Sequence, residues 1–86
     1  MHSVDLLEAA MDLAQRLGYT VRQEWFGGSG GGTCAIGDRK MLFVDLALWP
    51  ADQLELVLDA LRREPGLDAV PMRHELREIL RMRKSA

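Results

Sequence analysis

The chain has 86 residues, of which 48% are hydrophobic and 28% are charged, a balance typical of one globular domain and unlike disordered or fibrous proteins. The formal net charge of −2 argues against attraction of the whole domain to nucleic acid, because neutralising phosphates requires a positive field. The single cysteine, Cys34, excludes an internal disulfide and the zinc sites that need paired cysteines.

The sequence also bears on location and association. No apolar run approaches the ~18 residues of a membrane span, and residues 1–5 lack the basic region of a secretion signal. We therefore expect a cytoplasmic protein with no membrane partner and no cofactor. A chain this short buries only about 60% of its unfolded surface, so association would add stability. A homo-oligomer, most simply a homodimer, is the expected state.

The first half of the chain predicts a helix followed by strands. Residues 4–17 place apolar side chains on one side of a helix, which Ser3 can cap and Gly18 can end. Residues 19–25 then alternate with a period of two, which predicts a strand with one face in water. A glycine-rich stretch, residues 27–32, follows.

Two further strands and a turn are expected after the glycines. Residues 33–36 read as a short strand, residues 37–40 carry turn chemistry, and residues 41–48 read as a strand. Because the last of these is apolar on both faces, we expect it at the centre of the sheet.

The second half predicts two more helices. Pro50 opens a helix with a regular apolar stripe, and the run Glu64-Pro65-Gly66 ends it. Residues 67–70 are a candidate edge strand, and a last helix is expected from Pro71 or Met72. The expected fold is a single α+β domain over residues 1–86, in the order α-β-β-β-α-(β)-α, with a three-stranded, mainly antiparallel sheet packed on helices.

The run GGSGGGTC at residues 27–34 matches neither standard phosphate-binding loop. A P-loop needs a lysine and then a helix, and the apparent match to a dinucleotide fingerprint at residues 30–35 leads into a strand end and a turn. Each glycine is unfavourable by ~0.5–1 kcal/mol relative to alanine, so the fold must require them. Three explanations stay open: positive φ angles, packing against Trp25 or Trp49, and contact with a ligand or partner.

Asp45 is a carboxylate inside an otherwise apolar strand. A buried, unpaired charge is unfavourable, so the side chain must be hydrogen-bonded, ion-paired, protonated or at an open edge. It could accept bonds from N–H groups of the glycine stretch, or pair with Arg22 or Arg39.

Two resemblances rest on short runs. The run Leu17-Gly18-Tyr19-Thr20-Val21 after a helix, and the later run Leu42-Phe43-Val44-Asp45-Leu46, resemble the core of restriction-endonuclease-like nucleases. That resemblance implies an acid on the second strand and a Glu-x-Lys on the third, which hold magnesium. These positions fall at Cys34, Asp45 and Ala47, so the catalytic motif is lost except at Asp45. The chain is also similar to a family of small uncharacterised bacterial proteins, which implies no activity.

The remaining reactive and basic residues favour structural roles. Cys34 reads as a small buried hydrophobe, and a Cys34/His74 pair or zinc bound by Cys34, His2 and His74 are weaker alternatives. The last helix is basic, which predicts a solvated face and leaves nucleic-acid binding as an alternative. Its basic residues are Arg73, Arg77, Arg81, Arg83 and Lys84.

The sequence as a whole favours a non-catalytic binding or protein-interaction module that self-associates. No catalytic and no metal-binding residue is assigned. A degenerate metal-dependent hydrolase centred on Asp45 is one alternative, and nucleic-acid binding through the last helix is another. The expected binding residues are Gly28, Ser29, Gly30, Gly31, Gly32, Cys34 and Asp45.

Overall fold

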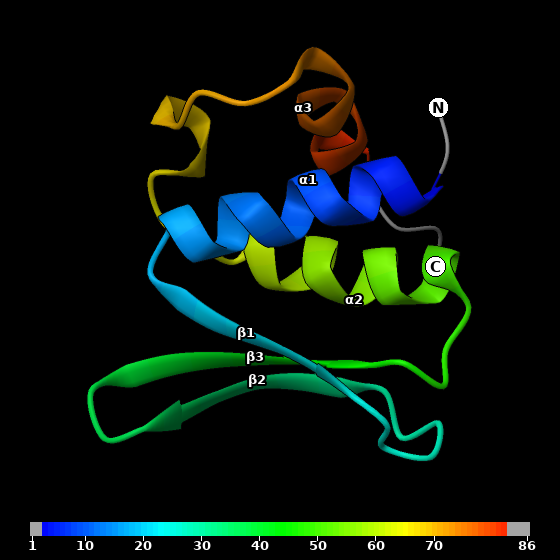
Figure 1. The fold of residues 1–86 in the computed structure, drawn as a ribbon. Helices are drawn as coiled ribbons and strands as arrows, with labels where there is room; N and C mark the ends of the chain where they lie inside the picture. Colours follow the sequence, from blue (N-terminus) through cyan, green and yellow to red (C-terminus); the bar gives the residue numbers. More distant parts are fainter. Residues whose placement is uncertain (1–2, 83–86) are drawn as a thin grey trace.

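The protein folds as two helices on one face of a three-stranded sheet, with a shorter helix on top (Figure 1). The structure is a computed structural model that describes residues 3–82. In Figure 1, α1 and α2 lie between the sheet and α3. The elements in chain order are α1 (Ser3–Arg16), β1 (Tyr19–Glu24), β2 (Gly31–Ile36), β3 (Arg39–Asp45), α2 (Pro50–Arg62), η1 (Leu67–Ala69) and α3 (His74–Arg81). The predicted α+β class is confirmed.

The sheet is mixed and has the order β1-β3-β2. β2 runs antiparallel to β3, with Cys34 opposite Met41, whereas β1 runs parallel to β3, with Val21 opposite Leu42. β3 is therefore central, as its apolar sequence predicts. β1 and β3 are parallel because the chain reverses direction twice between them, once before β2 and once after it. One of the two strand pairs is antiparallel, so the sheet is mixed where the sequence favoured a mainly antiparallel one.

Several boundaries differ from the sequence-based expectation. β3 ends at Asp45 and not at residue 48, because the chain turns there, with the N–H of Leu48 donating to the carbonyl of Asp45 at 3.1 Å. Residues 67–69 form a 3-10 turn and not a strand, since Gly66 enters it in the left-handed region with φ 79°. α3 starts at His74, later than Pro71 or Met72.

The core lies between the sheet and the helix pair. Leu42 and Val44 of β3 face the helices and are fully buried, as are Leu13 of α1 and Leu58 of α2. α3 closes the outer side of the helix pair with Leu76. Because strand side chains alternate, Phe43 between them, like Met41 before them, points to the opposite face of the sheet.

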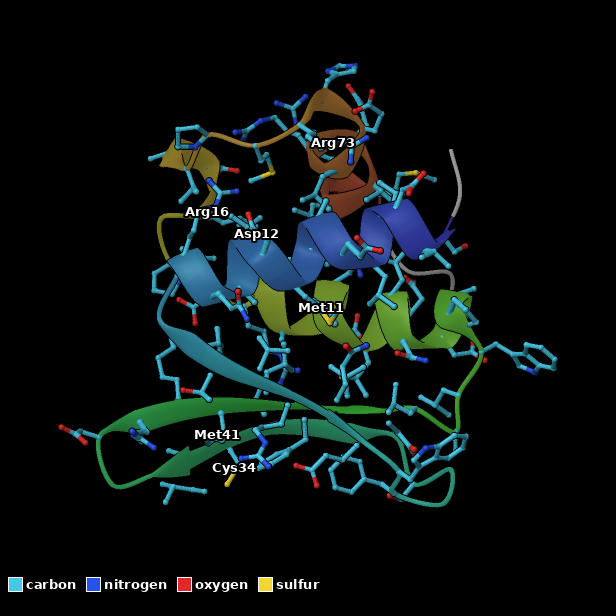
Figure 2. The ribbon with its side chains drawn as sticks, viewed as in Figure 1. Met11, Asp12, Arg16, Cys34, Met41 and Arg73 are labelled. Atoms are coloured by element: carbon cyan, nitrogen blue, oxygen red, sulfur yellow. The ribbon has the colours of Figure 1, made fainter. Side chains whose placement is uncertain are left out.

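That opposite face carries no helix from the described part of the chain (Figure 1). We call it the uncovered face, because no helix of residues 3–82 packs on it (Figure 1), and define it by Cys34, Ile36, Met41 and Phe43, which share one side of β2 and β3 by their register. Met41, in the central strand, is nevertheless buried by its neighbours. Figure 2 shows Cys34 and Met41 on the side of the sheet away from α1 and α2. At one end of this face, the chain between β1 and β2 folds over the sheet, and Phe26 packs edge to face on Phe43 with ring centroids 5.8 Å apart.

Candidate functional site

The carboxylate of Asp45 organises the loop between β1 and β2. Its Oδ1 accepts hydrogen bonds from the N–H groups of Phe26 at 3.0 Å and Ala47 at 2.9 Å. Its Oδ2 accepts from the N–H groups of Gly28 at 2.7 Å and Gly30 at 3.0 Å. The side chain is 0% exposed. Four backbone donors therefore surround one buried carboxylate.

These contacts determine the charge state of Asp45. Burial alone would raise the pKa of the carboxyl. The four N–H donors together lower it by more than burial raises it, so the net pKa lies below the ordinary value. The predicted acceptance of bonds from loop N–H groups is thus confirmed. The alternative partner Arg22 instead pairs with Glu24 at 2.7 Å. Asp45 is an ionised structural anchor.

The anchored loop explains the glycines at its end. At Gly31, φ is 95°, and a Cβ atom there would collide with the carbonyl group of Phe43. Ser29 closes the turn by donating its hydroxyl to the carbonyl of Phe26 at 2.9 Å. Positive φ at every glycine of the loop and close backbone approach at Gly31 therefore account for these residues, and contact with a ligand or partner stays a prediction. The alternative of packing against Trp25 or Trp49 is wrong, because these side chains are 74% and 79% exposed.

The same geometry leaves the loop poorly suited to a metal or a phosphate. The N–H groups of Gly28 and Gly30 point inward to Asp45 and are not available to an anion. Both oxygens of Asp45 are occupied, and residues 3–82 contain no group of three His, Cys, Asp or Glu side chains that could hold a metal ion. The nuclease-like alternative thus finds no support in the environment of Asp45.

Cys34 is exposed, which corrects the expectation of a buried thiol. The reason is topological: β2 is an edge strand, and Cys34 lies on the uncovered face. His74 begins α3 on the far side of the helix pair and lies 3.6 Å from Glu78, so the structure does not bring it to Cys34 (Figure 1). His2, Arg83 and Lys84 lie outside the described residues.

Within residues 3–82, the outer edge of β2 is exposed, and its sequence lacks the usual protection. The N–H of Asp45 donates to the carbonyl of Gly30 at 3.2 Å. The backbone of Gly30 therefore faces β3. Since the residues of an antiparallel strand turn alternately toward and away from their partner strand, every second residue after Gly30 also faces β3, and the backbone groups of Thr33 and Ala35 point outward. We call these outward groups the β2 edge. Edge strands are commonly protected by charged residues or proline, and β2 has neither in GGTCAI, whereas β1 carries Arg22 and Glu24.

A groove of about 410 Å³ runs beside the β2 edge, between β2 and α2. Its wall on α2 carries Asp52, Glu55 and Asp59, which we call the acidic wall. Leu56 lies among them, and Arg63 lines the groove as well. Asp59 already pairs with Arg62 at 3.1 Å. Sequence reasoning missed this groove, although the spacing of the three acids in α2 was visible as a single polar stripe.

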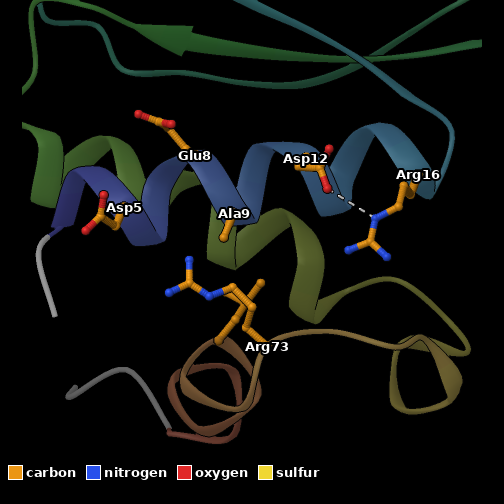
Figure 3. A pocket seen from close by; sticks show the side chains of 7 residues that line it. Asp5, Glu8, Ala9, Asp12, Arg16 and Arg73 are labelled. Carbon is orange, nitrogen blue, oxygen red and sulfur yellow. Dashed lines mark ion pairs between the residues drawn. The ribbon is translucent and has the colours of Figure 1, made fainter.

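A second hollow, of about 360 Å³, lies between α1 and the start of α3 (Figure 3). Asp5, Glu8 and Asp12 of α1 line it, together with Arg16 and Arg73. Arg16 pairs with Asp12 at 3.3 Å and donates to the carbonyl of Pro71 at 3.1 Å. Figure 3 shows the Asp12–Arg16 pair on the surface of α1. These contacts attach the segment before α3 to α1, which is a structural role.

The basic residues of α3 are partly used by the fold. Arg77 donates to the carbonyls of Asp68 at 3.3 Å and Val70 at 2.6 Å, and so holds the chain between η1 and α3. Arg73 lies 3.8 Å from Glu75. The predicted solvated basic face thus holds only in part at Arg77, whose side chain is half-buried and bonded to the chain before α3.

Comparison of the chain with protein families, with curated proteins and with solved structures found no match. Within residues 3–82, no helix combines the length and the apolar character needed to cross a membrane.

Proposed function

We propose that this protein is a non-catalytic interaction module that binds an extended segment of a protein partner along the β2 edge. The observation that carries this proposal is the unprotected edge strand itself. An extended peptide can add to an exposed sheet edge through main-chain hydrogen bonds, and alternate side chains then give specificity. Thr33 and Ala35 offer the outward N–H and C=O groups for such pairing.

The anchored loop supports this proposal because it holds β2 in place. Asp45 fixes Gly28 and Gly30 immediately before β2 begins, and β2 pairs with β3 along its whole length. Because β2 is already ordered, binding of a partner would cost little conformational entropy of this strand. In this proposal Asp45 and the glycines before β2 position the β2 edge. Gly31, Gly32 and Cys34 belong to β2 itself, the strand to which the partner segment would add.

The test uses a substitution that removes one outward donor. Ala35→Pro eliminates an N–H that does not bond to β3, and proline is tolerated at such positions of edge strands. The matched control, Ala35→Ser, keeps the N–H. Peptides selected from a random display library on the wild-type protein should lose binding to Ala35→Pro and keep binding to Ala35→Ser. Peptides that bind both variants equally, or a selection that yields none, would contradict the proposal.

Self-association is a second candidate, and the uncovered face favours it. Ile36 is 55% exposed, and the exposed Cys34 lies two positions away on the same side of β2. Packing this face against a second copy would remove apolar surface from water. Ile36→Lys should shift a dimer to a monomer in sedimentation velocity. Val4→Lys, at a site on α1 that is 49% exposed, is the control and should leave the dimer intact. A wild-type monomer at high concentration would exclude this candidate.

A further inference from the structure

We infer that the segment bound at the β2 edge carries basic side chains, lysine or arginine, at alternate positions. This inference rests on the proposed function and adds the chemistry of the partner. It follows from the position of the acidic wall relative to the strand that would be added.

The alternation of a strand determines which partner residues enter the groove. On β2, Thr33 lies opposite Leu42, whose side chain faces the helices, so Thr33 is on the helix side of the sheet. In a strand added beside β2, every second side chain would point to the same side. Those side chains would enter the groove between β2 and α2, and the others would extend the uncovered face.

The groove presents negative charge to those side chains. Asp52 and Glu55 form no ion pair with any other residue of the described chain, and both line the groove. Asp59 adds a third carboxylate, although Arg62 partly neutralises it. Against these acids, Arg63 is the basic residue in the lining. The lining therefore has an excess of negative charge.

The spacings of the helix and the strand are compatible. At about 1.5 Å per residue, Asp52 and Asp59 lie about 10 Å apart along α2. Alternate residues of an extended strand lie about 7 Å apart. Two successive helix-side residues of the partner therefore fit within the length of the acidic wall. Lysine and arginine have long apolar stems that can follow Leu56 while their charged ends reach the carboxylates.

The acidic wall also argues against a second copy at this edge. If β2 paired in the antiparallel direction with β2 of another molecule to continue the sheet, the two copies would be related by an axis perpendicular to the sheet, so both α2 helices would lie on the same side and face each other. Asp52, Glu55 and Asp59 would then oppose the same residues of the second copy. Like charges brought together in this way oppose association. The charge pattern thus selects a basic partner segment over self-pairing at the β2 edge.

Three synthetic peptides test the inference by fluorescence anisotropy. They share threonine and valine at the positions that would extend the uncovered face, and at the helix-side positions they carry lysine, glutamine or glutamate. We expect the lysine peptide to bind about tenfold or more tightly than the glutamine peptide at low salt, with this preference reduced by added salt. The glutamate peptide should bind most weakly.

Matched protein variants locate the effect. The double variant Asp52→Asn/Glu55→Gln should remove most of the preference for lysine over glutamine. The control Asp5→Asn/Glu8→Gln makes the same change in net charge on α1, away from the groove, and should preserve the preference. Equal loss in both double variants would overturn the inference, because it would show attraction by overall charge.

The outcomes separate the inference from the proposed function. If the lysine and glutamine peptides bind equally and Ala35→Pro abolishes both, strand addition stands and the basic partner is excluded. If lysine-peptide binding is unchanged in Ala35→Pro, the proposed strand addition fails and the inference fails with it. If no peptide of the three binds to the wild-type protein, both are overturned.

Discussion

Replacing Gly31 by alanine tests the most constrained backbone position in the glycine loop. Two effects combine there. With φ at 95°, a Cβ introduces strain of about 1–3 kcal/mol. The added Cβ would also lie 2.8 Å from the carbonyl carbon of Phe43, in the central strand. Relieving that overlap would displace β3 from its neighbours, which adds about 1–3 kcal/mol. Gly31→Ala should therefore lower the free energy of unfolding by about 2–6 kcal/mol, a large part of the about 5–15 kcal/mol expected of a native domain.

Gly32→Ala is the matched control. Gly32 also has a positive φ, 136°, but a Cβ there would meet no atom within 4 Å. It should show only the strain, and thus unfold at a higher temperature than Gly31→Ala. Each kcal/mol corresponds to about 4–8 °C in a domain of this size. Thermal unfolding followed by far-ultraviolet circular dichroism measures the difference, since the exposed Trp25 and Trp49 are poor reporters of the core. Equal midpoints for the two variants would refute the collision with Phe43.

Three further predictions concern titration and reactivity. Because the pKa of Asp45 is held below 3.8, the stability that this group contributes is present above that pH and is lost as pH falls through the folded pKa. Asp45→Asn should be less stable at neutral pH, and its free energy of unfolding should fall less on acidification. Parallel profiles of stability against pH for the two proteins would contradict this. Burial and the hydrogen bond to Glu64 raise the pKa of Tyr19, the single tyrosine, to about 12. The stability that the neutral phenol contributes is therefore fully present below pH 10 and is lost as pH rises through about 12. Phenolate absorbance should show Glu64→Gln bringing this pKa back toward 10, and an unchanged titration would exclude the contact. A thiol reagent should modify Cys34 in the folded monomer nearly as fast as in denaturant, and strong protection would show that the uncovered face is covered.

The helices and the strands of the sheet were predictable because apolar periodicity determines which side of an element is buried, whereas the short run at residues 67–70 is too brief to show a period. The environment of Asp45 was predictable for a related reason: a charge in an apolar strand needs donors, and the neighbouring glycines could provide them. Periodicity predicted a central β3, which in a three-stranded sheet places β2 at an edge, but it does not give the direction of the strands. The parallel pairing of β1 with β3 was therefore missed, and the exposure of β2 was not inferred from its edge position.

The errors at the candidate site concern exposure, which depends on how the edge strand lies relative to the helices. Cys34 was expected to be buried because residue type is informative on average, whereas its exposure depends on lying at a sheet edge without a covering helix. The acidic groove was not predicted, because the sequence does not show that Asp52, Glu55 and Asp59 of α2 lie beside a strand. They acquire meaning only when β2 is placed beside α2.

The parallel pairing of β1 with β3 also has a consequence for how the chain folds. β2 and β3 are joined by a two-residue turn at residues 37–38, so their pairing can form early from residues close in sequence. Tyr19, by contrast, pairs with Lys40, twenty-one positions later, and can do so only after the intervening chain has been ordered. We expect the hairpin of β2 and β3 to form the folding nucleus, with β1 and α1 docking afterwards. The segment that the partner would contact would then be among the first parts of the sheet to form.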